Sequence, residues 1–353
     1  MYKNSLNNKN HFVFEKFFAY FCRLKKAWKI YMFTTKVEIP ESPVKIAYED
    51  SIMTLGSCFS ENIGKKLQDV YFNSDINPFG VLYNPVSVKN SLYFLLHGKR
   101  FTENDLFFDG DLWHSFMHSS VFSDVSAEGC LQKINSQLEK SKVFLQQTKF
   151  LFITFGTAYV YEHVKDGKIV SNCHKLPAKE FARYRLSIDD IVSDYNELLT
   201  ELNSQIPGLH IIFTVSPIRH WKDGAHENNI SKAILLQAVD VLQKRFENNI
   251  SYFPAYEIQL DELRDYRYYA GDMLHPSETA IDYIWTRFSD CFFSAETNKI
   301  KKELELLNAD FAHRPLHPQS ESYKKFQKST EKKKEILTEQ YPFLAERFEL
   351  LNR

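Results

Sequence analysis

The most informative stretch of this 353-residue chain is Thr54-Leu55-Gly56-Ser57-Cys58-Phe59-Ser60. The apolar residues 52–55 predict a short buried strand, and Gly56 permits the tight turn that ends it. Apolar residues then recur at helical spacing at 63, 67 and 70, which predicts an amphipathic helix beginning near Ser60. Ser57 and Cys58, two nucleophilic side chains, are therefore expected at a strand-to-helix turn.

The amide groups at a helix start favour negative charge, so a thiolate or an oxyanion would be stabilised beside this turn. A cysteine in such a place, close to an imidazole, is expected to have a lowered pKa. The same residues also suit a structural turn, in which Ser57 caps the helix and Cys58 is buried. The segment alone does not separate the two interpretations.

Two further segments resemble this strand in length and composition. Residues 150–155 run directly into Gly156, and residues 210–215 run into Ser216-Pro217. Helical patterns over residues 188–202 and 230–246 lie between and after them. Alternating strands and helices with continuous apolar strands predict β-α-β units and a parallel, doubly wound sheet.

Ligands of such sheets bind beyond the carboxyl ends of the strands. The turns at residues 56–60, 156–159 and 216–220 all follow such ends. They are therefore expected to converge on one rim, which favours a functional site there.

Composition excludes several other classes of protein. Hydrophobic residues make up 44% of the chain and the net charge is -1, so no overall charge favours nucleic acid or an anionic membrane. No apolar run is long enough to span a bilayer. The five cysteines are widely spaced without a CxxC pair, which indicates neither a disulfide framework nor a zinc knuckle and favours a reducing, cytoplasmic location.

The chain is expected to have three parts. Residues 1–31 form an N-terminal extension in which charged residues interrupt the aromatic runs. This extension does not resemble a signal peptide and is expected to be either an appended amphipathic segment or no part of the natural translation. Residues 32–298 form the main domain. Residues 299–353 are rich in Lys and Glu with an apolar stripe, which predicts a helical C-terminal appendage with solvated charged faces.

A second chemical feature is the turn Gly271-Asp272-Met273-Leu274-His275, which precedes a helix expected to be capped by Ser277. An Asp three residues before a His can hydrogen-bond one imidazole nitrogen and leave the other free as a base. Nucleophilic hydrolases use this arrangement to orient the imidazole.

With these motifs the chain resembles the GSCFA-domain family, within the larger SGNH/GDSL-like hydrolase superfamily. The resemblance covers residues 37–326 and is carried by short motifs: Gly56-Ser57-Cys58-Phe59, Asn77-Pro78-Phe79-Gly80, Tyr83-Asn84-Pro85, Phe155-Gly156-Thr157-Ala158, Asn172-Cys173-His174-Lys175, Ser216-Pro217-Ile218-Arg219-His220 and Asp272-Met273-Leu274-His275. It implies a flavodoxin-like three-layer α/β/α sandwich with a mostly parallel sheet, followed by the helical appendage. It also implies a hydrolase or acyltransferase, with Asp272 and His275 as the acid and base.

The chain departs from the superfamily pattern at the nucleophile. A gapless match of the usual Gly-Asp-Ser to Gly56-Ser57-Cys58 places Cys58 at the nucleophile position. Ser57 has the usual chemical identity but requires a one-residue shift. Cys58 is favoured, and Ser57 stays an alternative.

The oxyanion-hole positions differ as well. Gly80 is the expected stand-in for the second-block glycine. The usual Gly-x-Asn appears as Gly156-Thr157-Ala158, so its side-chain amide donor is missing. Thr157, Asn172 or backbone amides are the expected replacements.

The remaining candidate site residues are three histidines, His118, His174 and His220, and two cationic residues, Arg219 and Lys175. The histidines lack the spacing of metal ligands, so hydrogen bonding in a core or pocket is expected of them, and neither a metal nor a cofactor is predicted. His174 and Arg219 are predicted to contribute to substrate binding, Arg219 with Lys175 toward an anionic group or a neighbouring carboxylate.

The sequence therefore predicts an enzyme that acts on a small-molecule or carbohydrate ester, by attack of Cys58 or Ser57 with His275 as base and Asp272 orienting it. Hydrolysis and O-acyl transfer both fit. The alternative from another class is a non-catalytic module that keeps the fold and binds a glycan or a protein at the rim.

Overall fold

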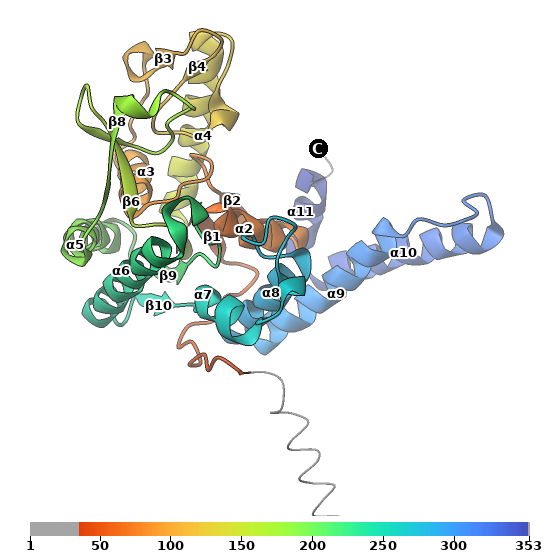
Figure 1. Ribbon diagram of the computed structural model, residues 1–353. Helices are drawn as coiled ribbons and strands as arrows, with labels where there is room; N and C mark the ends of the chain where they lie inside the picture. Colours follow the sequence, from red (N-terminus) through yellow and green to blue (C-terminus); the bar gives the residue numbers. More distant parts are fainter. Residues whose placement is uncertain (1–34, 352–353) are drawn as a thin grey trace, which may run out of the picture.

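The computed structural model describes residues 35–351 and contains a central parallel sheet of five strands, ordered β10-β9-β5-β1-β2 (Figure 1). Its strands are β1 (Ser51–Gly56), β2 (Asn73–Ile76), β5 (Phe150–Phe155), β9 (His210–Val215) and β10 (Ile250–Tyr252). The three strands predicted from apolar runs are confirmed, and so is their parallel pairing. The edge strands β2 and β10 were not predicted, because they are short and partly polar.

Helices cover both faces of the sheet and make it the middle layer of three. Successive strand residues point to opposite faces, so Met53 and Leu55 face one core while Ile52 faces the other. The first core is completed by α3 (Pro85–Leu96), α4 (Ala127–Gln146), α5 (Ile188–Gln205) and α6 (Gly224–Arg245). The second is completed by α2 (Cys58–Asp69), α8 (Glu278–Phe292) and α9 (Ala295–Ala312). The predicted α/β/α sandwich is confirmed.

The register of the sheet brings the strand ends together. Gly56 pairs with Thr154 on β5, and Phe155 pairs with Val215 on β9. Because parallel strands end at the same edge, the turns that follow β1, β5 and β9 lie next to one another. This is the edge at which the sequence placed its candidate nucleophiles.

A second, smaller sheet extends beyond this edge (upper left in Figure 1). It is antiparallel in the order β7-β6-β8 and is formed by β6 (Tyr159–His163), β7 (Lys168–Val170) and β8 (Phe181–Arg185). The hairpin β3 (Phe107–Phe108) and β4 (Trp113–His114) lies nearby. Six short helical segments complete the loops: η1 (Glu103–Asp105), η2 (Ser120–Phe122), η3 (Ala178–Glu180), η4 (Trp221–Asp223), the π-helical η5 (Ile258–Glu262) and η6 (Tyr266–Tyr268), with α7 (Ala255–Glu257) before η5.

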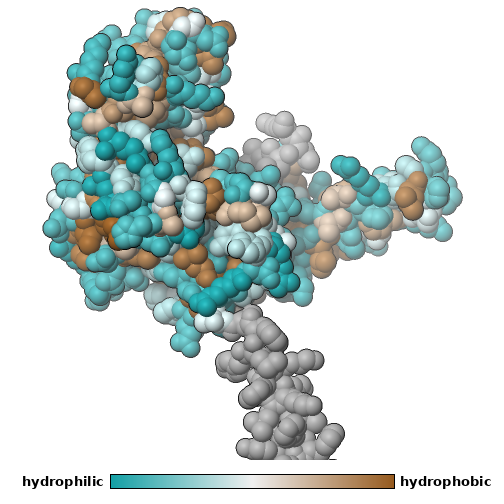
Figure 2. Space-filling model, viewed as in Figure 1, coloured by the Kyte–Doolittle hydropathy of each residue, from teal (hydrophilic) through white to brown (hydrophobic). Residues whose placement is uncertain are grey.

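The C-terminal region is helical, as expected. The helices α9 and α10 (Glu321–Gln340) form an arm that projects from the sandwich, and α11 (Phe343–Leu351) returns to it (Figure 1). Arg347 on α11 donates hydrogen bonds to the carbonyls of Tyr48 and Tyr71, at 2.6 and 2.9 Å. Figure 2 shows apolar residues scattered along the arm between hydrophilic ones.

The predicted extension, residues 1–31, lies outside the described residues, and the domain boundaries at 32 and 299 stay predictions. None of the helices within residues 35–351 combines the length and the apolar character needed to cross a membrane.

Candidate functional site

The helix α2 begins at Cys58, two residues before the expected start, and Ser57 is its N-cap. The Ser57 hydroxyl accepts a hydrogen bond from the Phe59 amide at 3.3 Å, and its side chain is buried. Cys58 is the first helical residue, so its amide N–H has no acceptor within the helix. Its thiol and its amide therefore both lie at the positive end of the helix dipole.

Gly56 makes this turn possible. Its φ is +133°, and a Cβ built on it would lie 2.1 Å from the carbonyl oxygen of Thr154 on the neighbouring strand. A side chain at this position would collide with backbone, which cannot move aside without breaking the sheet. The predicted need for glycine here thus has two causes, the backbone angle and the close approach of β5.

The Asp272–His275 turn is held by the Asp272 carboxylate. Its Oδ1 accepts hydrogen bonds from the amides of Leu274 and His275, at 2.9 and 3.0 Å, and its Oδ2 lies 2.5 Å from His275 Nδ1. These bonds, the backbone ones first, lower the pKa of Asp272 to about 2. Asp272 is therefore ionised at neutral pH, and it orients the ring so that Nε2 is free.

His275 Nε2 lies 4.0 Å from Cys58 Sγ. This is a long contact, at the outer limit for a hydrogen bond to sulfur, and sites without substrate are often loose in this way. No comparable contact joins Ser57 Oγ to His275 among the described residues. The fold thus brings together the three residues Cys58, His275 and Asp272, from motifs more than 200 positions apart.

Burial raises the pKa of the Cys58 thiol, and the nearby Glu61 adds to the effect. Hydrogen bonds from the amides of Cys58 and Phe59 act in the opposite direction but are outweighed. The expectation of a lowered pKa is therefore wrong, because loss of solvation exceeds the benefit of the helix start. At neutral pH the thiol keeps its proton until a base removes it.

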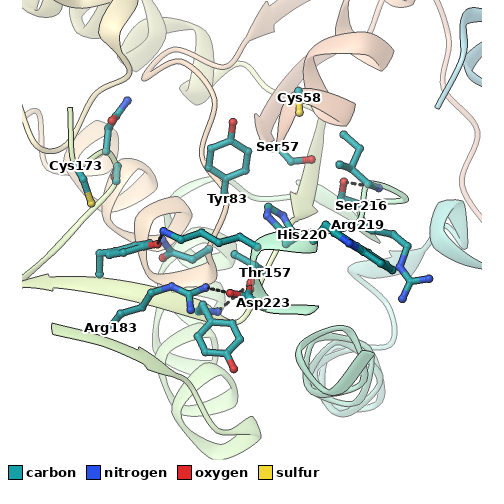
Figure 3. Close-up of a pocket in the computed structure, with 18 of the residues that line it drawn as sticks. Ser57, Cys58, Tyr83, Thr157, Cys173, Arg183, Ser216, Arg219, His220 and Asp223 are labelled. Carbon is teal, nitrogen blue, oxygen red and sulfur yellow. Dashed lines mark hydrogen bonds and ion pairs between the residues drawn. The ribbon is translucent and has the colours of Figure 1, made fainter. Parts of the chain in front are cut away.

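A cavity of about 600 Å³ opens next to Cys58. It extends from Cys58 at the sheet edge to Arg183 on the second sheet, as Figure 3 shows, and His275 also lines it. Side chains from five regions of the chain line it: Ser57, Cys58, Tyr83, Asn84, Thr157, Tyr159, Tyr161, Val170, Ser171, Asn172, Cys173, Arg183, Ser216, Ile218, Arg219, His220, Trp221, Lys222, Asp223 and His275.

The far wall of the cavity is aromatic and charged. The Arg183 guanidinium lies 4.0 Å from the centre of the Tyr159 ring and pairs with Asp223 at 2.5 Å. Lys222 donates a hydrogen bond to the Tyr161 hydroxyl at 2.9 Å. These contacts hold the second sheet and the segment after β9 together, so the cavity has a preformed outer wall.

The fold places some of the predicted binding residues in the cavity wall and others outside it. Thr157, Asn172 and Arg219 line the cavity, whereas Lys175 does not. Gly156 lies behind its wall, where a Cβ would come within 2.9 Å of the Tyr83 carbonyl oxygen. Its amide and that of Thr157 both donate to this oxygen, at 2.8 and 2.9 Å.

Gly80 and His174 lie outside the cavity. The Gly80 amide donates to the Asn77 carbonyl at 2.6 Å and is therefore not free to bind an oxyanion. His174 is buried, with Nε2 at 2.9 Å from the Ser115 carbonyl oxygen and Nδ1 at 3.4 Å from Ser120 Oγ. The placement of these two residues in the site is corrected: both are structural, because the Gly80 amide is used within its own turn and the His174 imidazole is buried against the segment 115–120.

The loop 77–84 has a structural role that its motifs did not reveal. The Asn77 amide donates to the Thr54 carbonyl at 2.8 Å, and Asn77 Oδ1 accepts from the Gly56 amide at 3.0 Å. The Leu82 amide donates to the Gly56 carbonyl at 2.8 Å. With the Tyr83 contacts described above, this loop joins the ends of β1 and β5 and supports the turn that carries Cys58.

Sequence reasoning gave no role to Lys232 on α6. Its Nζ is buried and donates to the carbonyls of Gly156 and Ser216, each at 2.7 Å. Burial, and then the charge of Arg219, lower its pKa to about 7. A signal was present, because Lys232 shares the helix face of Leu235 and Val239, which are core residues.

His118 and His220 lie apart from each other. His118 is buried between Phe79 and Phe101, outside the cavity, whereas His220 is in the cavity wall. Within residues 35–351 no group of three His, Cys, Asp or Glu side chains is arranged to hold a metal ion.

Three solved structures are similar to this one at low TM-scores. One is a "putative acylhydrolase" from Bacteroides fragilis, with a TM-score of 0.35 and 10% identity, covering 74% of this chain and 91% of that chain. Another is a carbohydrate esterase family 2 enzyme with a carbohydrate-binding domain from Corynascus thermopiles (Myceliophthora fergusii), with a TM-score of 0.36 and 11% identity, covering 71% of this chain and 67% of that chain. The third is an acetyl xylan esterase from the rumen bacterium Butyrivibrio proteoclasticus, with a TM-score of 0.36 and 12% identity, covering 69% of this chain and 64% of that chain. At these scores the likenesses carry no argument about function.

No curated protein matches the chain in sequence. The profile of the GSCFA family, in contrast, matches residues 51–288, which include every residue of the site. The profile of the GSCFA domain protein C-terminal domain matches residues 304–351. The chain belongs to the GSCFA family.

Proposed function

We propose that this protein is a cysteine-dependent acyl hydrolase or acyltransferase that acts on esters. The observation that carries the proposal is the relay Cys58 Sγ, His275 Nε2, His275 Nδ1 and Asp272 Oδ2, at the mouth of a cavity large enough for a small substrate. Asp272 fixes the tautomer of His275, so the free Nε2 faces the thiol.

In the first step His275 Nε2 takes the thiol proton as Cys58 Sγ attacks the ester carbonyl. The sulfur–carbon bond forms, the carbon–oxygen bond of the ester breaks, and the leaving alkoxide receives the proton from His275. Water or a second hydroxyl then attacks the thioester with His275 as base again. The acyl group leaves as an acid or as a new ester, and the thiol recovers its proton.

Cys58 rather than Ser57 is assigned the attack. The Ser57 hydroxyl is used as the helix cap, whereas the Cys58 thiol is the group within reach of His275. Because burial raises the pKa of this thiol, its reactivity is expected to depend on His275 and to increase as the pH rises.

Labelling with a thiol reagent tests the nucleophile. Methyl methanethiosulfonate is expected to modify Cys58 in the wild-type protein, faster at pH 9 than at pH 7, with the modified peptide identified by mass spectrometry. Cys173, which lies across the cavity from Cys58 in Figure 3, provides a matched control. Cys173→Ser is expected to keep the Cys58 label, and Cys58→Ala to lose it.

Turnover is measured on a panel of esters that includes p-nitrophenyl acetate, acetyl thioesters and acetylated sugars, with the acid and any transferred ester quantified. Cys58→Ala and His275→Ala are expected to lower turnover by roughly 10³-fold or more, and Ser57→Ala much less. If Ser57→Ala folds normally and loses as much turnover as Cys58→Ala, the attack is made by Ser57. A wild-type protein that binds members of the panel but turns over none would instead support the non-catalytic binding module.

A further inference from the structure

The attack on an ester carbonyl creates a negative charge on oxygen, which a hydrolase stabilises with at least two hydrogen-bond donors. The Cys58 amide at the start of α2 is one donor. Four other amides near the strand ends are already used: Gly80 donates to Asn77, Gly156 and Thr157 donate to Tyr83, and Ala158 donates to Ser231 Oγ at 2.8 Å. These four amides do not supply the second donor, and side chains of the cavity wall are candidates for it.

Several polar side chains of the wall are already held by hydrogen bonds, in the two asparagines through the acceptor oxygen only. Thr157 Oγ1 lies 3.1 Å from Ser231 Oγ and accepts from the Tyr159 amide, and Asn172 Oδ1 accepts from the His174 amide. Asn84 caps α3 through its Oδ1, which accepts from the Ser87 amide.

His220 is a further candidate donor. Within residues 35–351 neither of its ring nitrogens has a hydrogen-bond partner, although the ring lines the cavity. In Figure 3 the ring lies between Tyr83 and Ser57, on the side toward Cys58.

The His220 ring is held in place from several directions. Its backbone amide donates to Asn228 Oδ1 at 2.9 Å, and its ring meets that of Tyr83 edge to face, with 5.7 Å between the centroids. A Cβ on Gly156 would lie 3.3 Å from His220 Nε2, so the absence of a side chain at Gly156 leaves room for the ring. A fixed donor needs no reorganisation when charge develops on the substrate.

The electrostatic surroundings keep this imidazole neutral. Burial first, and then the positive charges of Lys232, Arg183 and His275, lower the pKa of His220 to about 4. A neutral imidazole has one N–H and is a poor base, so it does not compete with His275 for the thiol proton. Neutral histidines with lowered pKa values polarise substrate carbonyls in this way in other enzymes.

We propose that His220 is a further catalytic residue, which donates a hydrogen bond to the carbonyl oxygen of the bound acyl group together with the Cys58 amide. The role rests on the acyl chemistry proposed above. The imidazole keeps its proton throughout: the hydrogen bond strengthens as the oxygen becomes negative and weakens again when the carbonyl is restored.

Two substitutions test the role. His220→Ala removes the donor and is expected to lower kcat by about 10²- to 10³-fold with little change in KM. His220→Gln keeps an N–H donor and is expected to recover part of the loss. His97→Gln is the matched control, since His97 is exposed at the end of α3, outside the cavity, and full activity is expected of it.

The rate of Cys58 modification by methyl methanethiosulfonate separates this role from a merely structural one, because the reagent has no carbonyl to stabilise. It is expected to stay within about twofold of wild type in both His220 variants. A His220→Ala protein with wild-type kcat would overturn the proposal, and so would one that loses thiol reactivity as much as turnover. If Cys58→Ala stays fully active, the attack by Cys58 proposed above is wrong, and the role of His220 beside the Cys58 amide is wrong with it. If Cys58→Ala is inactive while His220→Ala is not, only the role of His220 is wrong.

Discussion

Cys58 and Asp272 illustrate how their surroundings shift the pKa values of two acidic side chains in opposite directions. Asp272 is exposed and accepts three hydrogen bonds, so its charged form is stabilised and its pKa lies at about 2. Cys58 is at a helix start but largely buried, and loss of solvation raises its pKa. The site therefore combines a permanent carboxylate with a protonated thiol, and the His275 imidazole connects them.

Asp272→Asn separates the charge of this residue from its structural role. The Asn Oδ1 still accepts the amides of Leu274 and His275, so the turn is expected to persist, while the charge that supports the imidazolium is lost. Turnover of the best ester is expected to fall by roughly 10²- to 10⁴-fold with unchanged thermal unfolding. Asp272→Ala, which also removes the turn, is expected to lose at least as much; wild-type kcat in Asp272→Asn would rule out an orienting carboxylate.

At the scale of elements, the site depends on how closely three strand ends approach one another. Lys232 joins the carbonyls that follow β5 and β9, and the loop 77–84 joins the ends of β1 and β5. Backbone carbonyls and amides just beyond the strand ends have no partner within the sheet. They need partners such as these, because a buried carbonyl or amide without a hydrogen bond lowers the stability of the fold. Several motif residues of the family therefore support the edge rather than the chemistry.

Gly56→Ala tests the close approach of β1 and β5. The added Cβ would meet the Thr154 carbonyl at 2.1 Å, and the φ of +133° is unfavourable for alanine, so a loss of more than about 4 kcal/mol of unfolding free energy is expected. Gly167→Ala is the control: its φ is +66° and nothing lies within 4 Å of its Cβ, so only about 1 kcal/mol is expected to be lost. Urea unfolding of both variants measures the difference, and equal losses would contradict the argument from close approach.

For the molecule as a whole, buried histidines make stability dependent on pH. Burial, and then the charge of Lys149, lower the pKa of His210 to about 4, and burial and His174 lower that of His118 to about 3. In the unfolded chain both histidines take up protons near pH 6.5. The unfolded state therefore binds more protons between pH 6.5 and the folded pKa, so their contribution to stability is complete above pH 6.5 and is lost as the pH falls.

The unfolding free energy is accordingly expected to fall between pH 7 and pH 4.5, by at most about 3 kcal/mol for each fully buried histidine. His210→Gln keeps a side chain that can bond Ser251 Oγ, the present partner of His210 Nε2 at 2.8 Å, but it does not titrate. Its unfolding free energy is expected to depend less on pH than that of the wild type, as measured by urea titrations at both pH values. His97→Gln, at an exposed position, is expected to follow the wild-type pH dependence, and an equal pH dependence in His210→Gln would contradict the assignment to His210.

Much of the central fold was predictable because its strands are buried on both faces. Continuous apolar runs identified β1, β5 and β9, and the turn residues after them identified the functional edge. The short strands β6, β7 and β8 were missed, since they are partly exposed and carry many charged and aromatic side chains. The hydrophobic pattern of the sequence therefore did not predict most of the outer wall of the cavity, which includes Tyr159, Tyr161 and Arg183.

Local periodicity and short motifs were enough to predict the strands β1, β5 and β9, the glycine turn after β1 and the family, because each of these depends on residues that are close together in the chain. The folded structure was needed to show that Cys58 lies within reach of His275 while Gly80 and His174 lie elsewhere, and that burial raises rather than lowers the pKa of the thiol. The reason is physical: distance, solvation and the use of each hydrogen-bond donor depend on residues that are far apart in the chain and become neighbours only when the strands pair.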